Sequence, residues 1–110
     1  MSLEQIIYNE IERHHRGREN AIKRGELLAY CQLWESEMTD RELRNIYSRL
    51  SVCTCEDGIF FPIRPEELEE FRIYLAKKAG PMFERWRMVA QAHPHLVKDG
   101  SEQLKLFQGG

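Results

Sequence analysis

A change in the spacing of apolar residues near position 50 constrains the fold of this chain more than any other feature. Between residues 39 and 50 the apolar positions recur at helical spacing, at Leu43, Ile46, Tyr47 and Leu50. Residues 52–63 then become β-branched, cysteine or aromatic, interrupted by Asp57-Gly58. Because glycine accepts a positive φ, Asp-Gly between two such runs is a strong hairpin signal. The sequence therefore predicts a helix followed directly by a β-hairpin, with Pro62 limiting the second strand to an edge role.

A capping box marks the start of the 39–50 helix, and two further helices are expected before it. Thr39 and Glu42 have the spacing of such a box. An earlier amphipathic stripe, stopped by Gly17, is formed by Leu3, Ile6, Ile7 and Ile11. After a short extended piece at Ala21-Ile22, another helix has an apolar face made of Leu27, Leu28 and Cys31. Helix, short strand, helix, turn, helix and hairpin is the order of a winged helix-turn-helix. We therefore expect an α+β, mainly α fold with such a domain over residues 1–64.

A long helical segment is expected after the hairpin. Pro65 suits the first position of a helix, and an apolar stripe of helical period follows it. Gly80-Pro81 interrupts this stripe, and proline removes one helix hydrogen bond. We therefore expect a long C-terminal helix over residues 65–95, kinked or broken at Gly80-Pro81, that packs on the first domain or on a partner. Residues 96–110 are polar with one apolar group and are expected to form a flexible tail.

Composition limits the possible functions. The 110 residues carry a formal net charge of -2, so no overall basic field announces nucleic acid, and DNA contact must rest on local charge. The first residues lack the basic start and apolar stretch of a signal peptide, and no apolar run is long enough for a bilayer. Three cysteines without a secretion signal favour reduced thiols. We expect a cytoplasmic protein with no membrane partner.

Three stretches within residues 11–92 carry a resemblance to a known family. They are Ala21-Ile22 before Glu26-Leu27, Thr39-Asp40-Arg41-Glu42-Leu43-Arg44-Asn45-Ile46-Tyr47, and, after the hairpin, Pro65-Glu66-Glu67-Leu68-Glu69-Glu70-Phe71. In this pattern the chain resembles winged helix-turn-helix DNA-binding proteins of bacteriophages and prophages. The resemblance implies DNA binding through the helix that carries Arg41, Arg44 and Asn45. The hairpin departs from the family, because Asp57-Gly58-Ile59-Phe60 replaces the usual Gly-Tyr-Tyr. Two carboxylates, Glu56 and Asp57, stand at its tip, so we do not expect this hairpin to grip phosphate.

The residue types on the 39–50 helix suit base recognition. Arginine can bond guanine in bidentate fashion, and asparagine suits adenine. We expect the outward face of this helix to contact DNA through Arg41, Arg44, Asn45, Ser48 and Arg49. A basic stretch between residues 13 and 24 is expected to meet phosphates beside that helix, through Arg16, Arg18, Lys23 and Arg24. The alternative for both sets is an ordinary solvated surface.

A short motif in the tail points to a protein partner. Its sequence, Gln103-Leu104-Lys105-Leu106-Phe107, is similar to the peptide by which bacterial replication and repair proteins engage the β sliding clamp. Such a segment offers apolar anchors to a pocket while a glutamine supplies a hydrogen bond. The expected partner-binding residues are Gln103, Leu104, Leu106 and Phe107. The alternative is a terminal strand or turn that folds back on the core.

No catalytic, metal or cofactor site is expected. Cys53-x-Cys55 and His93-x-His95 could be read as zinc ligands, but cysteines two apart on a strand share one face, and packing explains them better. Phosphate loops, nucleophile elbows and paired carboxylates in a catalytic context are absent from the sequence. We therefore expect a protein that is not an enzyme and has no cofactor.

These observations lead to one principal hypothesis and two alternatives. The principal hypothesis is a phage or prophage protein that binds double-stranded DNA in replication or its regulation, with a tail that engages the sliding clamp. The first alternative is a transcriptional regulator that forms a homodimer through the C-terminal helix. The second is a protein-protein adaptor that does not touch DNA, which the acidic hairpin tip and the negative net charge favour.

Overall fold

The computed structural model describes residues 2–78 and 83–97 of the chain. Within these residues the fold is α+β and mainly α, with five α-helices and one two-stranded antiparallel sheet, which confirms the expected class. Two short 3-10 helices, η1 and η2, complete it. In chain order the elements are α1 (Leu3–His14), η1 (Arg18–Asn20), α2 (Arg24–Cys31), α3 (Asp40–Tyr47), β1 (Cys53–Cys55), β2 (Gly58–Phe60), α4 (Pro65–Lys77), α5 (Phe83–Ala92) and η2 (Pro94–Leu96).

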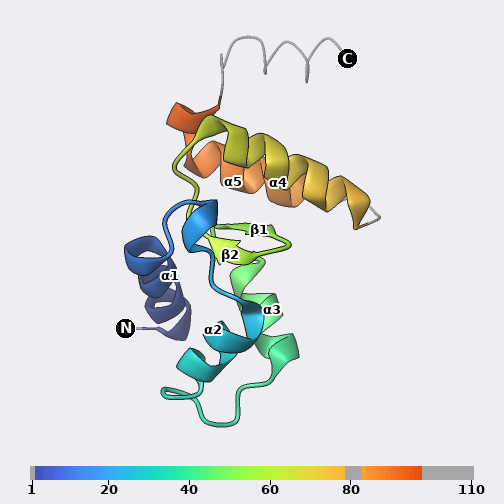
Figure 1. The fold of residues 1–110 in the computed structure, drawn as a ribbon. Coiled ribbons are helices and arrows are strands. Elements are labelled where there is room, and N and C mark those ends of the chain that lie inside the picture. Colours follow the sequence, from blue (N-terminus) through green and yellow to red (C-terminus); the bar gives the residue numbers. More distant parts are fainter. Residues whose placement is uncertain (1, 79–82, 98–110) are drawn as a thin grey trace.

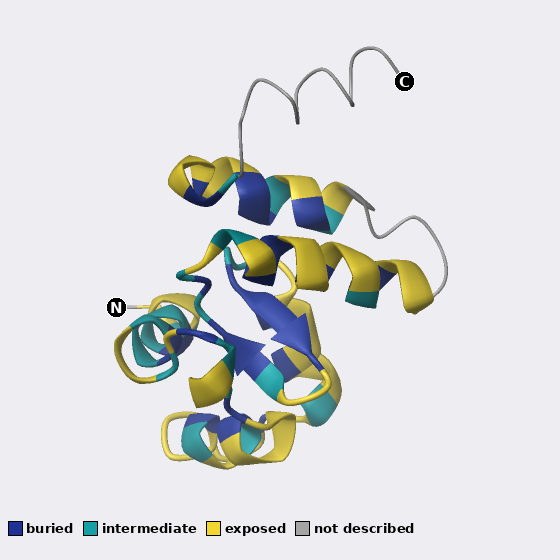
Figure 2. Ribbon diagram, turned by 45° about the horizontal axis from the view of Figure 1, so that its top comes forward, coloured by how far each residue is buried: buried dark blue, intermediate teal, exposed yellow. Residues whose placement is uncertain are grey.

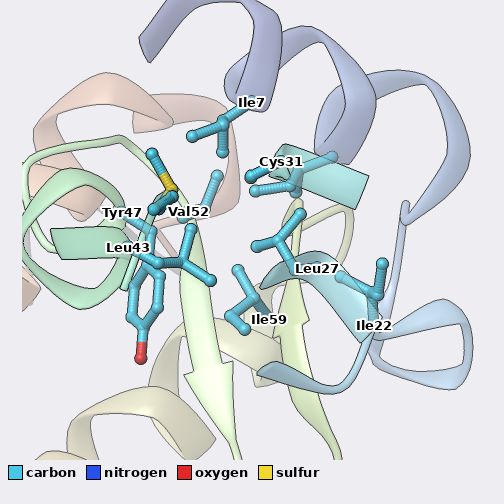
Figure 3. Close-up of a cluster of buried hydrophobic side chains, with 10 residues drawn as sticks. Ile7, Ile22, Leu27, Cys31, Leu43, Tyr47, Val52 and Ile59 are labelled. Carbon is cyan, nitrogen blue, oxygen red and sulfur yellow. The ribbon is translucent and has the colours of Figure 1, made fainter. Parts of the chain in front are cut away.

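Helices α1, α2 and α3 pack around one apolar cluster, which we call the first cluster (Figure 3). The expected capping box is present: Glu42 N–H donates to the Thr39 hydroxyl at 3.2 Å, and the Glu42 carboxylate accepts from the backbone of Thr39. Because apolar side chains recur once per helical turn, each helix offers one face to this cluster. Its buried residues are Ile7, Ile11, Ile22, Leu27, Cys31, Met38, Leu43, Tyr47, Val52 and Ile59.

The hairpin forms where the sequence predicts it. Cys55 pairs with Gly58, so Glu56 and Asp57 make the turn. Gly58 has φ of 133°, and a Cβ there would lie 2.1 Å from the carbonyl oxygen of Ile22, so only glycine fits. That approach exists because Ile22 and Ile59 exchange two backbone hydrogen bonds of 2.9 Å. The extended piece predicted at Ala21-Ile22 is therefore confirmed, and Ile22 forms an isolated antiparallel bridge with Ile59 of β2.

The hairpin is buried on both faces. Ile59 belongs to the first cluster, whereas Cys53, Cys55 and Phe60 belong to a second cluster on the opposite face. The strands accordingly lie in the middle of the molecule, between α1–α3 and the α4–α5 pair (Figures 1 and 2). The other buried members of the second cluster are Leu68, Phe71, Leu75, Trp86, Val89, Ala90 and Leu96.

The C-terminal segment, expected as a long helix that is kinked or broken, forms two helices, α4 and α5. Helix α4 packs on β1, and α5 lies beside α4 (Figures 1 and 2). Trp86 of α5 joins them, because its indole N–H donates to the carbonyl oxygen of Leu68 at 2.9 Å. Folding the segment back buries the apolar stripes of both helices, which one straight helix would leave without a partner. The expected interruption at Gly80-Pro81 and the tail residues Gln103, Leu104, Leu106 and Phe107 lie outside the described residues.

Candidate nucleic-acid interface

The outward face of α3 presents polar and cationic side chains together. Leu43 and Tyr47 hold the opposite face in the first cluster, so α3 has one fixed orientation. Within residues 2–78 and 83–97, the side chains of Arg41 and Asn45 make no hydrogen bond or ion pair. The exposed set on this face is Arg41, Arg44, Asn45, Ser48 and Arg49, which are the residues predicted for base and backbone contact.

Asp40 at the start of α3 brings two arginines together. The Nε atom of Arg24 lies 2.8 Å from one oxygen of Asp40, and the Nε atom of Arg44 lies 3.3 Å from the other. Both guanidinium groups remain about half exposed, at 51% and 54%. Arg24 from the start of α2 thus lies beside the cationic face of α3. Exposed ion pairs of this kind contribute roughly 0–1 kcal/mol, so a phosphate could replace Asp40 as their partner at small cost.

Arg49 is also paired, but weakly. Its Nη2 atom lies 2.8 Å from a carboxylate oxygen of Glu4 on α1, and both side chains are about half exposed or more. Ser48 donates its hydroxyl to the backbone carbonyl of Asn45 at 3.0 Å. These contacts order the end of α3 without burying its polar atoms. The whole face therefore remains accessible.

The basic loop before α2 divides into an anchored half and an open half. Arg16 lies over the ring of Phe61 at 4.7 Å. Arg18 lies 3.1 Å from Asp57 and 2.6 Å from Glu70, and these bonds raise the pKa of its guanidinium. Both arginines thus fasten the loop to the hairpin and α4. Lys23, by contrast, has no ion pair among the described residues and lies next to Arg24.

Helix α4 fixes the position of this loop through a buried acid. Glu67 is 2% exposed and accepts from the backbone amides of Arg18 at 2.7 Å, Ile63 at 2.8 Å and Arg64 at 3.0 Å. Next to it, Arg64 lies 2.6 Å from Glu19, and that bond lowers the pKa of the Glu19 carboxyl to about 2. The acidic run at the start of α4, which the sequence explains by the helix dipole, therefore also holds the loop.

A groove opens between the starts of α2 and β2, the end of α3 and the end of α4. Its volume is about 390 Å³. Lys23 and Arg24 line it together with Lys78, which follows the last turn of α4. Sequence reasoning assigned no role to Lys78, because 54 residues separate it from Arg24 and only the packing of α4 on β1 brings them to one groove. The remaining lining residues are Tyr47, Tyr74 and the hairpin residues Thr54, Cys55, Glu56, Asp57, Gly58 and Ile59.

The cysteines are core residues in the structure. Cys31, Cys53 and Cys55 are buried as free thiols, and Cys53 and Cys55 share one face of β1. Burial raises the pKa of Cys31 to about 11 and raises that of Cys53 further, so neither is a thiolate near neutral pH. Among the described residues, no three His, Cys, Asp or Glu side chains are grouped to hold a metal ion.

Comparison with known proteins adds no relative. No family model matches the chain, and no curated protein or solved structure is significantly similar to it. None of the helices in the described parts of the chain is long and apolar enough to cross a membrane.

Proposed function

We propose that this chain is a winged helix-turn-helix protein of phage or prophage type that binds double-stranded DNA. The observation that carries the proposal is the exposed face of α3 and of the turn that ends it, which follows α2 and combines Arg41, Arg44 and Arg49 with an asparagine. The order of α1, the Ile22 bridge, α2, α3 and the hairpin supports the same class. In this proposal α3 is the recognition helix and enters the major groove.

The contacts divide into two kinds. Arg41, Arg44 and Asn45 read base edges, because arginine and asparagine match guanine and adenine in the major groove. Ser48, Arg49, Lys23 and Arg24 bind phosphates and set the orientation of the helix. Arg16 and Arg18 act indirectly, because their bonds to the hairpin and α4 hold the loop that precedes Lys23.

The hairpin does not reach the duplex in this proposal. Its strands are buried on both faces, and its tip carries Glu56 and Asp57. Arg18 compensates Asp57 at 3.1 Å, so the tip retains one carboxylate without an ion pair among the described residues. DNA binding therefore depends on α3 and α2.

The tail supplies the biological setting that we propose. The residues Gln103, Leu104, Leu106 and Phe107 resemble a sliding-clamp peptide, which favours a role in DNA replication or its regulation. A peptide covering residues 101–108, tested for binding to the bacterial clamp, examines this part alone. No binding would remove the clamp from the proposal and leave DNA binding to be judged separately.

Duplex binding is the direct test. We expect the full chain to bind duplexes from its own neighbouring genomic DNA at low salt, and to lose affinity as salt rises. Arg44→Ala should weaken binding about tenfold, the effect of losing one good base contact. Arg87→Ala is the matched control, because Arg87 is an exposed arginine on α5, away from α3, and should change binding less than about twofold.

Two results would contradict the proposal. One is no retention of any duplex at low salt by the folded chain. The other is equal binding by the wild type, Arg44→Ala and the Arg87→Ala control, which would mean that α3 does not contact DNA. Fluorescence anisotropy with labelled duplexes measures all three.

A second candidate function, a protein-protein adaptor, is favoured by a separate observation. Leu33 and Trp34, in the turn between α2 and α3, are 80% and 60% exposed. Large apolar side chains exposed side by side are typical of protein contact sites. Glu35 and Glu37 flank them and would repel DNA. An adaptor would retain its partner when Arg44 is changed and lose it with Trp34→Ala.

The dimeric transcriptional regulator has less support. Its dimer seam was expected on the C-terminal helix, but the apolar faces of α4 and α5 pack on each other and on β1. Ile73, 44% exposed, is the large apolar side chain on α4 that remains partly open. Sedimentation at micromolar concentration tests this reading, because a monomer does not suit a palindromic DNA site.

A further inference from the structure

The groove beside α3 carries a net positive charge. Lys23, Arg24 and Lys78 line it against Glu56 and Asp57. Arg24 is paired with Asp40, and Asp57 is paired with Arg18. Among the described residues, Glu56 is thus the acid of the groove that has no ion pair. Lys23 and Lys78 have no carboxylate partner in that same part of the chain, and Lys78 lies over the ring of Tyr74 at 5.1 Å. The groove therefore favours an anion.

A partly buried arginine, Arg85, lies behind Tyr47, which lines the groove. The Arg85 guanidinium lies over the rings of Tyr47 at 5.7 Å and Phe71 at 5.3 Å. Its Nε and Nη2 atoms are buried and make no hydrogen bond in the described structure. Burial lowers the pKa of Arg85, while the nearby tyrosines Tyr47 and Tyr74 oppose that shift. Buried N–H donors without an acceptor are costly, and an anion in the adjacent groove would offset part of the cost of placing this charge there.

The groove is continuous with the face of α3. Arg24 both lines the groove and bonds Asp40, which also bonds Arg44. Tyr47 extends from α3 with its hydroxyl directed away from the first cluster, and it is also a lining residue of the groove (Figure 3). A chain of cationic groups therefore runs from Arg44 through Arg24 and Lys23 to Lys78.

We propose that this groove is a phosphate-binding site that extends the DNA interface from α3 across the start of α2 to the end of α4. This inference rests on the proposed DNA binding. A backbone phosphate of the strand that flanks the recognition helix enters the groove, where Lys23 and Lys78 bind its oxygens. Arg24 continues the cationic surface of α3 into the groove, and Arg85 adds positive potential from behind Tyr47. The end of α4, absent from the sequence-based interface, becomes part of it.

Salt-dependent duplex binding tests the groove. Each lysine that binds a phosphate releases counterions, so Lys78→Ala should weaken duplex binding about threefold to tenfold and reduce the slope of log K against log salt by about one. The double variant Lys23→Ala/Lys78→Ala should reduce the slope by about two. Lys77→Ala is the matched control, because Lys77 is the exposed neighbour on α4 that does not line the groove, and it should leave the slope near that of the wild type.

The outcomes separate this inference from the function on which it rests. If the wild type binds no duplex, DNA binding itself has failed. If the wild type binds, Arg44→Ala weakens binding, and both groove variants behave like Lys77→Ala, then the groove alone has failed. Titration with inorganic phosphate at constant ionic strength distinguishes a free anion from DNA. Phosphate-induced shifts of groove amides that disappear in Lys78→Ala, with duplex binding unchanged in that variant, would assign the groove to a free anion and overturn the proposal.

Discussion

The two halves of the molecule use charge in opposite ways. On α3 the cations face solvent, and their few carboxylate partners are exposed and weak, as between Arg49 and Glu4. On α4 two acids bind other parts of the chain: the buried Glu67 accepts from three backbone amides, and the exposed Glu70 accepts from Arg18. The net charge of -2 adds the cations of the one region to the acids of the other, although the two sets lie apart. A whole-chain charge therefore says little about binding when acids of one region are used for structure and cations of another remain open.

The same two halves share one structural element. The hairpin places Ile59 in the first cluster and Phe60 in the second, so its two strands belong to the apolar cores of both halves. His93 and Arg85 on the α5 side add contacts across it, to Ser51 and to Tyr47. This sharing implies that the halves fold together.

Phe71→Ala should destabilise both halves at once. Phe71 is 1% exposed in the second cluster, and truncation of a buried phenylalanine costs about 3–5 kcal/mol. We expect one urea transition, in which far-UV circular dichroism of all helices and the fluorescence of Trp86, measured in a Trp34→Phe background, change together. Leu43→Ala, in the first cluster, is the matched variant and should show the same coincidence. A fluorescence transition that precedes the loss of helix in Phe71→Ala would show that the α4–α5 half unfolds independently.

Arg85→Met should raise stability while lowering DNA affinity. The change removes the buried Nε and Nη2 donors that have no acceptor, and replacing buried ionic groups by apolar side chains is neutral or gains up to roughly 4 kcal/mol. Two cation–π contacts worth about 0.5–2 kcal/mol each are lost, and the methionine sulfur recovers part of this against the same rings. We expect a net gain of about 1 kcal/mol in the free energy of unfolding, measured by urea denaturation. Arg87→Met on the exposed side of α5 should lie within about 0.5 kcal/mol of the wild type.

The opposite result for Arg85 would be equally informative. A loss of stability in Arg85→Met with unchanged duplex binding would mean that the guanidinium serves only to join the two clusters. The anion site would then lose its support from Arg85 and rest on Lys23 and Lys78.

The junction at His93 should make stability depend on pH. His93 is 4% exposed, its Nε2–H donates to the carbonyl oxygen of Ser51 at 2.9 Å, and its ring packs on Phe61 at 4.9 Å. Burial lowers the pKa of His93 below its ordinary value of 6.5. The unfolded chain then binds the proton more readily than the folded chain. The contribution of neutral His93 to the free energy of unfolding is therefore complete above pH 6.5 and is lost as the pH falls through the lower pKa of the folded state.

Urea denaturation between pH 7.5 and 5.5 measures this effect. The free energy of unfolding of the wild type should decrease across this range, and part of the decrease should be missing in His93→Gln. Equal pH slopes for the two proteins would show that His93 does not titrate differently in the folded state.

Local patterns in the sequence determined the individual elements. The capping box at Thr39 depends on residues three apart, and the hairpin turn depends on Asp57-Gly58, so both are readable without knowing what lies nearby. The apolar stripes of α1, α2 and α3 likewise specified which faces turn inward. The outward set on α3 followed directly, because it is what remains when Leu43 and Tyr47 are buried.

Tertiary packing decided the rest, because it depends on residues that are distant in the sequence. No local pattern indicates that α5 returns alongside α4, that the hairpin is covered on both faces, or that Asp57 and Glu70 bind Arg18. The same holds for the groove, which Lys78 and Lys23 line together only because α4 packs on β1. Spacing along a chain specifies a helix or a turn and the face it buries. Which charges remain open for a ligand is specified by the partners that packing brings within bonding distance.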